Sequence, residues 1–491
     1  MTTNKQAVHG SRYSGERFDV VNPRTGTVDY NFIAPTDAEL RARLAALRAA
    51  QPAWREAGLE ARIAALARWR AALLQHRDAI VNALAADTGR YSIPVSEFDA
   101  VLGYIARWSS DAVTLTRESA GESRSMPSLR WRSQHVPYQL VAAISPWNFP
   151  FTLTLIDAIP ALLAGCAVCV KPSEVTPRFA GPLLDSIAAV PELAAVFAIV
   201  PGGRATGETL VAQSDVICFT GSVKTGRLVG VNAAQHFIPA FLELGGKDPL
   251  IVTANADIER ATDIALRASV LATGQACQSL ERVYVDRRVY QSFVDKLVAK
   301  AKRVELNWPD LHAGHIGPFI WGRQADVVAA QLADAVSKGA RILCGGKVED
   351  HGGKWLAPTV LVDVSHDMLI MQEETFGPVI PVMPYDSVAE AVALANDSVY
   401  GLSAGVVAGT VDEAEAIGRR IDAGGVSLND GSLTALMHEA EKNSFKLSGL
   451  GGSRMGPAGY LRFFRSKVLI QQTGAPMVIE MIDERHAKPG V

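Results

Sequence analysis

Short apolar runs alternate with longer segments of helical spacing from about residue 140 onwards. The runs are LVAAI (140–144), AVCV (167–170), FAIV (197–200), DVICF (215–219) and AFLE (240–243). Continuous apolar runs between helices are typical of strands in a parallel sheet that helices cover. The pattern therefore predicts an α/β domain in this part of the chain.

A second series of the same kind follows. PLIV (249–252) and RVYV (282–285) are separated by a helical stretch near 258–273, and another helical stretch lies near 288–304. GVSLND, later in the chain, again has strand character. We therefore expect an α/β protein with two Rossmann-like domains, each built on a parallel sheet.

Three segments have strand character without a neighbouring partner. Residues 125–139 alternate arginines with large side chains, and RSKVLIQQ (465–472) and MVIEMI (477–482) lie near the C-terminus. Strands from distant parts of the chain can pair as an arm, and an exposed sheet edge of this kind often joins subunits. We expect a small β arm for oligomerisation, in a homodimer or a homotetramer.

The bulk composition is that of a globular protein with two or three domains, because 491 residues exceed one core. The net charge is −3, with Lys and Arg spread along the chain, which disfavours a nucleic-acid partner. The first residues lack the apolar stretch of a signal peptide. The longest clean apolar piece, AIPALLAGCAVCV, is shorter than the roughly 20 residues of a membrane span. We expect a cytoplasmic protein without a membrane partner.

The cysteines number five, an odd count at low density that suits a reducing compartment. Cys166 and Cys169 form a CxxC, but no second pair or histidine cluster accompanies it. The surrounding segment reads as a strand, in which positions three apart point to opposite faces. We expect both cysteines in the core, and no metal site.

Cys277 lies in LATGQACQSLERVYV (271–285), on a short connection between a helical segment and a strand. Catalytic residues often lie on such connections. A thiol with a reference pKa of about 8.5 is a good nucleophile once it is ionised. Taken alone, the setting favours a packing cysteine over a nucleophile.

Two further residues have side chains that could take part in catalysis. Glu243 ends the apolar run AFLE, and the carboxyl end of a strand is where α/β sheets place ligands. Asn148 lies between two prolines in SPWNFP, and a side-chain amide on such a rigid turn can donate to an oxyanion. Taken alone, each is better explained as a polar residue at a turn or a strand end.

The standard dinucleotide fingerprint GxGxxG is absent. Gly221 and Ser222 instead lie between a strand and a helical segment, where a helix N-terminus can bind phosphate. Lys171 and Glu174, in CVKPSE, follow an earlier strand, and a carboxylate there can hold the hydroxyls of an adenosine ribose. An ordinary strand-to-helix loop would explain either feature.

The motifs PWNFP, KPSEVTP, FTGS, LELGGKDP, GQACQS and EETFGPV occur in this order. Together they resemble the aldehyde dehydrogenase superfamily, and the resemblance runs from NPRTG at residue 22 to RSK near residue 465. The 34-residue step from Glu243 to Cys277 also fits that family. The resemblance implies that the Cys277 thiolate attacks an aldehyde, that Asn148 and the Cys277 N–H hold the oxyanion, and that Glu243 activates water to release a carboxylic acid.

The resemblance also implies an NAD-binding domain (1–124 and 140–242), a catalytic domain (243–458) and an oligomerisation arm (125–139 and 459–491). Lys171 and Glu174 would hold the adenosine ribose, and Gly221 and Ser222 would lie by the pyrophosphate. The remaining cofactor contacts that the resemblance implies are Glu374 and Phe376 at the nicotinamide ribose, with Ser145, Trp147, Ser173, Gly203, Gly207, Phe219 and Leu244. Because Glu174 would repel a 2′-phosphate, we expect NAD as cofactor, with NADP possible.

The chain departs from the family pattern in two places. EKNSFKLSGLGGSRMG (441–456) lacks the aromatic–glycine pair of a loop that helps line the aldehyde tunnel, so the aldehyde is not implied. Arg465 stands where many members carry an acid, which puts an accessory proton path in doubt. Gln275 and Gln278 have no role that the sequence assigns.

Several alternatives stay open at this point. Within the same chemistry, the protein is alternatively a semialdehyde dehydrogenase or one that passes the acyl group to coenzyme A. Members of the second kind often lack the glutamate, so Glu243 favours hydrolysis. A non-catalytic relative is disfavoured, because a binding role would not require Cys277, Glu243 and Asn148 together.

Overall fold

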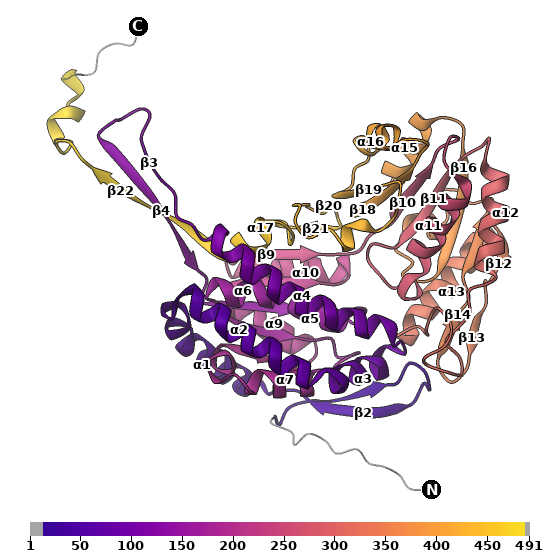
Figure 1. The fold of residues 1–491 in the computed structure, drawn as a ribbon, viewed down its shortest axis with the longest axis horizontal. Helices are drawn as coiled ribbons and strands as arrows, with labels where there is room; N and C mark the ends of the chain where they lie inside the picture. Colours follow the sequence, from indigo (N-terminus) through magenta and orange to yellow (C-terminus); the bar gives the residue numbers. More distant parts are fainter. Residues whose placement is uncertain (1–12, 487–491) are drawn as a thin grey trace.

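The computed structural model describes residues 13–486, and residues 1–12 and 487–491 lie outside the described residues. Two α/β lobes lie next to each other, and a narrow β arm projects from the first lobe away from the second (Figure 1). Within the described residues, no helix is long and apolar enough to cross a membrane.

The first lobe contains a six-stranded sheet with the order β21-β9-β8-β5-β6-β7. Strands β5 to β9 are parallel, and the short β21 pairs antiparallel with β9 at the edge. The chain runs outward from β5 in one direction and returns to add β8 and β9 on the other side, so the strand order reverses between β5 and β8. The strands are β5 (Leu140–Ile144), β6 (Ala167–Lys171), β7 (Phe197–Ile199), β8 (Val216–Thr220), β9 (Ala240–Glu243) and β21 (Gly449–Leu450).

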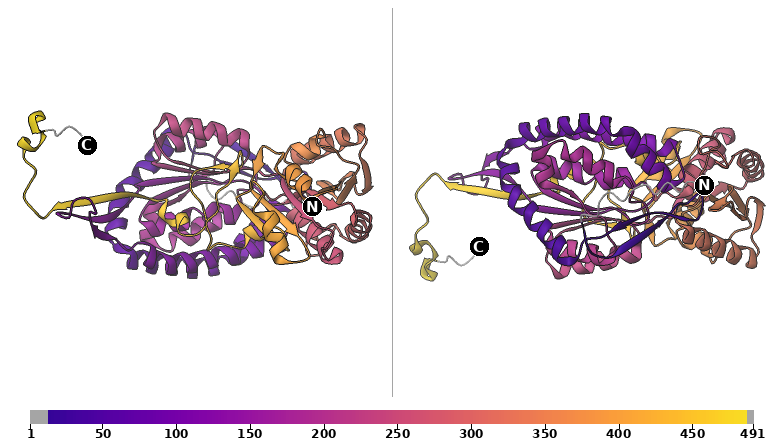
Figure 2. Two further views of the ribbon diagram at one scale, coloured as in Figure 1. Left: turned by 90° about the horizontal axis from the view of Figure 1, so that it is seen from above. Right: turned by 90° about the horizontal axis from the view of Figure 1, so that it is seen from below.

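Helices cover both faces of this sheet (Figure 2). The first of them begins with a capping box, in which Thr36 and Glu39 satisfy each other's backbone N–H groups. The helices are α1 (Asp37–Glu56), α2 (Gly58–Gln75), α3 (Arg77–Thr88), α4 (Ser92–Leu115), α5 (Pro150–Leu155), α6 (Ala158–Ala164), α7 (Ala180–Ala188), α8 (Pro191–Val196), α9 (Arg204–Gln213), α10 (Val223–Gln235) and α17 (Ala458–Leu461). A hairpin of β1 (Arg17–Val21) and β2 (Val28–Ile33) precedes them.

The second lobe contains a seven-stranded sheet with the order β12-β15-β16-β11-β10-β18-β19. All its neighbouring strands are parallel except β12 and β15. The strands are β10 (Asp248–Val252), β11 (Leu280–Asp286), β12 (Arg341–Cys344), β15 (Thr359–Val362), β16 (Val379–Tyr385), β18 (Ser403–Val407) and β19 (Gly425–Leu428). The two parallel sheets confirm the predicted α/β fold.

The helices and short ladders of the second lobe complete its two hydrophobic cores. The helices are α11 (Ile258–Val270), η1 (Leu271–Gly274), α12 (Tyr290–Ala301), α13 (Gly322–Ser337), α14 (Leu369–Gln372), α15 (Val388–Asn396), α16 (Val411–Gly418) and η2 (Leu433–Ala435). The ladders are β13 (Val348–Asp350) with β14 (Lys354–Leu356), and β17 (Tyr400–Gly401) with β20 (Phe445–Lys446).

The arm is the three-stranded sheet β22-β4-β3. β22 (Phe464–Gln472) pairs antiparallel with β4 (Leu129–Pro137) along its whole length, which confirms that the two distant segments pair. The expectation of a further strand at 477–482 was wrong. There the chain forms the 3₁₀ turn η3 (Ile479–Ile482), followed by η4 (Glu484–His486). With no strand beside it in the described chain, the segment satisfies backbone groups locally, as in the bond from Met481 N–H to Val478 O of 3.0 Å.

The predicted division into domains remains a prediction. Two short strands pair with the sheet of a different domain from the one to which the prediction assigned them. β3 (Ala120–Glu122) joins the arm sheet although we assigned it to the first domain, and β21 extends the first sheet although we assigned it to the second. Residues 1–12 and 487–491, which belong to the predicted first domain and arm, lie outside the described residues.

Candidate active site

The candidate site lies where the carboxyl ends of the first sheet meet the amino ends of the second. Glu243 is the last residue of β9, and the chain passes directly into β10 at Asp248. The loop after β5 contacts the loop before β11, because the Asn148 Nδ2 donates to Gln275 O at 3.0 Å. Ligands of α/β proteins bind at the carboxyl ends of parallel strands, so this junction is the expected place for chemistry.

Cys277 follows a turn in an unusual backbone conformation. Ala272 and Thr273 have φ angles of 55° and 63°, in the left-handed region that non-glycine residues rarely adopt. Gly274 is also left-handed, and an added Cβ there would lie 2.2 Å from Gly377 O. The Thr273 Oγ1 donates to Gly317 O at 3.0 Å, which helps to hold the turn. Such strain, of order 1–3 kcal/mol per residue, persists only where surrounding contacts fix it.

The Cys277 thiol is half-buried, and burial raises its pKa to about 12. The carboxylate of Glu374 raises this pKa further, as do Asp248 and Glu243, whereas the Lys442 ammonium lowers it. The thiol of the free protein is therefore protonated at neutral pH. Ionisation requires a gain of positive charge, or a loss of negative charge, near the sulfur.

The other four cysteines have different surroundings. Cys166, Cys169 and Cys218 are almost completely buried, as expected for core residues. Cys344 is half-buried, and burial raises its pKa. Only Cys277 and Cys344 are thus open to a small reagent.

Iodoacetamide should therefore alkylate Cys277 and Cys344 in the folded protein and leave the three buried cysteines unmodified. Because the pKa of Cys277 lies far above neutrality, its alkylation rate should rise about tenfold per pH unit between pH 7 and pH 9. Mass spectrometry of peptides from wild type and from Cys344→Ala measures the rate. A rate for Cys277 that is already flat at pH 7 would contradict the raised pKa.

Asn148 is buried on the turn between β5 and α5. Its side chain has one N–H on Gln275 O and a second N–H left for another acceptor. Glu97 accepts from Phe151 N at 3.1 Å and Thr152 N at 2.9 Å, which fixes the start of α5. The amide is thus held by contacts on both sides of the turn.

The structure assigns a role to both glutamines next to Cys277. Gln275 accepts from Ile320 N at 3.0 Å and donates to Pro318 O at 3.2 Å, so it ties the cysteine loop to the chain before α13. Gln278 accepts from the Thr434 Oγ1 at 2.6 Å. Both are structural links, which no local sequence pattern indicates.

Glu243 is half-buried at the end of β9, and its Oε2 accepts from the Ser444 Oγ at 2.9 Å. Its charge raises the pKa of Cys277, so the carboxylate lies within electrostatic reach of the thiol. Ser444 belongs to the segment that departs from the family pattern. The sequence marked that segment as divergent but did not indicate this contact.

A buried group of charges lies behind Glu243. The Arg454 Nη2 and Nε donate to the Asp157 carboxylate at 2.9 and 3.1 Å, and Arg462 pairs with the same carboxylate. Burial lowers the pKa of Arg454, but Asp157 and then Glu243 raise it, and the net shift is upward. A permanent positive charge therefore stands near Glu243. Arg465, by contrast, lies on the exposed arm strand β22, with its guanidinium 5.2 Å from the Tyr138 ring.

The residues predicted at the adenosine lie on neighbouring strand ends of the first sheet. The Lys171 Nζ donates to the Glu174 Oε2 at 3.0 Å, with the lysine buried and the glutamate exposed. Ser145 N donates to Lys171 O at 3.0 Å. The Ser173 Oγ accepts from Val175 N at 3.2 Å, which shapes the turn. The site has an ammonium, which can donate hydrogen bonds, and a carboxylate, whose free lone pairs can accept hydrogen bonds from ribose hydroxyls.

The predicted pyrophosphate position is the N-terminus of α10. The Ser222 Oγ caps this helix by accepting from Thr225 N at 3.3 Å. An added Cβ at Gly221 would lie 2.6 Å from the Phe219 ring, so a larger residue here would have to displace that ring. Leu244 similarly fills the space above Gly226, where an added Cβ would lie 2.4 Å from its Cδ2. The exposed N–H groups and the helix dipole fit a phosphate anion.

Gly203 and Gly207 lie at the start of α9, a helix that packs against α10. An added Cβ at Gly203 would meet the Phe18 ring at 2.7 Å, and one at Gly207 would lie 3.4 Å from Ile144. Both positions thus serve close packing. The structure does not bring them against the cysteine loop.

Glu374 and Phe376 are held by a buried ion pair. Glu281 accepts from Thr375 N and Phe376 N, both at 2.8 Å, and also pairs with the Lys247 Nζ at 2.8 Å. This contact stabilises Phe376 at a φ of 53°. Burial, and then Glu281, raise the pKa of Glu374 to about 8, while its Oε1 accepts from Gly246 N at 3.1 Å.

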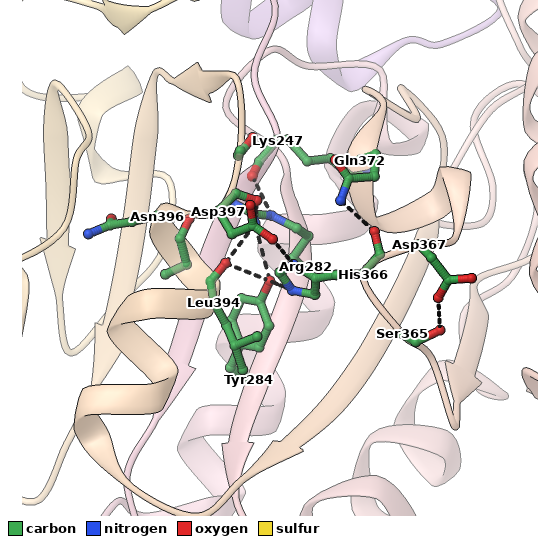
Figure 3. Close-up of polar contacts among 12 residues, drawn as sticks. Lys247, Arg282, Tyr284, Ser365, His366, Asp367, Gln372, Leu394, Asn396 and Asp397 are labelled. Carbon is green, nitrogen blue, oxygen red and sulfur yellow. Dashed lines mark hydrogen bonds and ion pairs between the residues drawn. The ribbon is translucent and has the colours of Figure 1, made fainter.

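Further contacts hold Phe376 and Lys247 on their other sides. The Trp147 ring lies edge-on to Phe376, with centroids 5.3 Å apart. On the far side, the Arg282 Nε donates to Lys247 O at 2.9 Å, and its Nη1 donates to the Tyr284 hydroxyl (Figure 3). His366 contacts the same hydroxyl at 2.9 Å. The turn before β16 is therefore fixed from the core of the second lobe.

A family model described as the aldehyde dehydrogenase family matches residues 11–469. The chain belongs to the aldehyde dehydrogenase family. A solved aldehyde dehydrogenase from Anabaena variabilis is 50% identical, with a TM-score of 0.93 over 95% of this chain and 100% of the other. A lactaldehyde dehydrogenase structure from Escherichia coli is 29% identical, with a TM-score of 0.89 over 94% of this chain and 96% of the other.

A Mycolicibacterium smegmatis protein that carries the name succinate-semialdehyde dehydrogenase (NADP+) is 36% identical over 88% of this chain and 84% of its own length. Membership makes this aldehyde dehydrogenase an NAD(P)-dependent oxidoreductase that acts on an aldehyde. The roles of Cys277, Glu243, Asn148 and the predicted cofactor contacts remain predictions.

Proposed function

We propose that this aldehyde dehydrogenase oxidises its substrate to a free carboxylate through a thioester on Cys277. The observation that carries the proposal is the meeting of three groups from three strand ends. The Asn148 amide contacts the cysteine loop at 3.0 Å, and the Glu243 carboxylate lies within electrostatic reach of the thiol.

The Cys277 thiol gives its proton to water, and the resulting thiolate forms a C–S bond to the aldehyde carbon while the carbonyl electron pair moves onto oxygen. The second N–H of Asn148 and the Cys277 N–H donate to that oxyanion. A bound nicotinamide would supply acceptance of the hydride from the former aldehyde carbon, and the thioester on Cys277 is left when that C–H bond breaks and the C=O bond reforms. Glu243 then takes a proton from water as the water adds to the thioester, the C–S bond breaks, and carboxylate and thiol are released.

The test is a product analysis with a panel of aliphatic, aromatic and charged aldehydes. Reduced cofactor and free carboxylate should form in equal amounts, and added coenzyme A should not raise the rate. Acyl-coenzyme A as the main product would overturn the hydrolytic assignment.

We infer that NAD is the preferred cofactor, although the M. smegmatis relative is named for NADP+. The support is Glu174, whose carboxylate lies 3.0 Å from the Lys171 ammonium at the predicted adenosine ribose. A carboxylate beside the 2′ position repels a 2′-phosphate, and Lys171 is already paired.

Glu174→Ala should accordingly raise kcat/KM with NADP about tenfold, while wild type prefers NAD by at least that factor. Loss of one like-charge repulsion is the reason. Steady-state kinetics with both cofactors provides the measurement, and Glu208→Ala on α9 is the control, because Glu208 is an exposed carboxylate paired with Arg204. A wild type that favours NADP would reverse the assignment.

A semialdehyde that bears a carboxylate is the candidate substrate that one observation favours. The Lys442 side chain runs past Gly425, where an added Cβ would lie 3.3 Å from its Cδ. Its ammonium lowers the pKa of both Cys277 and Asp248, so its charge acts at the reacting centre. Across residues 13–486, that ammonium has no ion-pair partner within 4.0 Å.

Lys442→Met should therefore lower kcat/KM for a carboxylated semialdehyde about tenfold relative to a neutral aldehyde of equal chain length. Loss of a cation whose charge acts on the thiol is the physical reason. The control is Lys446→Met, because the Lys446 Nζ donates instead to Asn396 O and Ser398 O. An equal fall in kcat/KM for both aldehydes would contradict recognition of the substrate carboxylate by Lys442.

We further propose that the arm joins subunits in a homodimer or homotetramer, and that the protein is cytoplasmic. Val468, Leu469 and Ile470 are exposed on β22, which supports a subunit contact. All five cysteines are free, which suits a reducing compartment. A monomer in size-exclusion chromatography at micromolar concentration would contradict the assembly.

A further inference from the structure

Arg90 links the two turns that bear the proposed oxyanion donor and nucleophile. Its Nη2 donates to Asn148 O at 2.6 Å, and its Nη1 donates to Ala272 O at 3.0 Å. Asn148 follows β5 of the first sheet, whereas Ala272 precedes β11 of the second. One guanidinium therefore connects the loop after β5 in the first lobe with the loop before β11 in the second.

This link closes a small ring of contacts. The Asn148 side chain donates to Gln275 O, and Gln275 N donates to Ala272 O at 3.2 Å. Arg90 completes the ring through the two backbone carbonyls. Because Ala272 and Thr273 are left-handed, the turn depends on such outside contacts to keep its shape.

The residue type matters at this position. A guanidinium is planar and directs two Nη groups at two acceptors at once, whereas an ammonium is a single point of donation. Arg90 is almost completely buried, and its guanidinium lies 5.6 Å from the Phe149 ring. Burial lowers its pKa to about 10, and Glu97 on α4 opposes that shift, so the side chain stays charged at neutral pH.

We propose that Arg90 is a positioning residue that sets the Asn148 amide against Cys277 without touching the substrate. The inference rests on the proposed roles of Asn148 and Cys277. If this is so, loss of the two Arg90 hydrogen bonds should misplace the Asn148 amide and slow acylation of the Cys277 thiol. The geometry of binding for the aldehyde itself is left unchanged.

Arg90→Lys should lower kcat about 10- to 100-fold with little change in KM, because a misplacement of about 1 Å costs on this order. Acylation of Cys277 by p-nitrophenyl acetate should fall by a similar factor, since this reaction also passes through an oxyanion. Alkylation by iodoacetamide forms no oxyanion and should change less than about threefold.

Arg62→Lys provides the matched control. Arg62 is also buried in the first lobe and donates to backbone carbonyls, at 2.9 Å to Leu163 O and 3.0 Å to Arg55 O, but it does not contact the site. Its replacement should lower Tm without the selective loss of acylation. Equal kinetic losses in Arg62→Lys and Arg90→Lys would overturn the proposal.

A double-mutant cycle with Asn148→Ala isolates the route of the effect. If Arg90 acts through Asn148, Arg90→Lys should cost less than about threefold more once the amide is gone. Additive losses would show that it acts elsewhere. If Asn148→Ala alone leaves kcat unchanged, the proposed oxyanion role fails, and this outcome is distinct from a normal kcat in Arg90→Lys alone.

If Arg90→Lys alone does not fold, the same substitution can be made together with Ala272→Gly. The double variant is then compared with Ala272→Gly alone. Glycine adopts the left-handed conformation without a Cβ penalty, so the turn needs less outside support. The same acylation and alkylation assays then apply. Because Arg90 also holds the Asn148 carbonyl, the double variant should still acylate more slowly than Ala272→Gly alone, and equal rates would overturn the positioning role.

Discussion

Cys277→Ala is expected to abolish aldehyde oxidation, with a fall in kcat on the order of 10⁴-fold or more. The methyl group cannot form the C–S bond on which the proposed route depends. The fold should survive, because the substitution removes a single sulfur atom from a half-buried side chain. Reduced-cofactor production and Tm measure the two effects separately.

Cys344→Ala is the control for this experiment, since Cys344 is the other half-buried thiol and lies on β12. It should retain wild-type kcat. Activity in Cys277→Ala within tenfold of wild type would remove the thioester from the mechanism.

Glu243→Gln should slow steady-state turnover about 100- to 10,000-fold and leave a rapid first turnover. The amide keeps the size of the side chain and still accepts from the Ser444 Oγ, but it cannot take a proton from water. Because the Glu243 charge raises the pKa of Cys277, the same variant should also alkylate faster at neutral pH. Stopped-flow measurement of reduced cofactor resolves the burst from the later rate.

Ser444→Ala is the matched control, because it removes the hydrogen bond to Glu243 and keeps the carboxylate. Its turnover should fall far less than that of Glu243→Gln. A Glu243→Gln enzyme that has lost the burst as well as the turnover would assign the glutamate to acylation instead of hydrolysis.

A strand or helix of the fold could be predicted where a single pattern of apolar residues is enough to identify it. Strands such as β5 and β6 are buried on both faces, so their sequences are continuously apolar and could be identified directly. The segment at 477–482 has the same apolar character but forms a 3₁₀ turn, because in the described chain it has no partner strand. Composition alone does not show whether a partner is present.

The candidate site divides in the same way. Glu243, Asn148 and Cys277 lie in motifs, and those motifs could be located from the chain alone. Arg90 and Lys442 could not, because each acts on residues distant in the chain and neither lies in one of the six motifs. Arg90 bonds to Asn148 and Ala272, 58 and 182 positions away, and Lys442 acts on Cys277. Their contacts exist only once the two sheets meet.

Intact-protein mass spectrometry of Glu243→Gln after one turnover with NAD and an aldehyde tests the central claim most directly. We expect a mass increase equal to the acyl group of that aldehyde, mapped by peptide analysis to Cys277 and removed by hydroxylamine. An unmodified protein after full reduction of one equivalent of cofactor, or an acyl group on another residue, would contradict it.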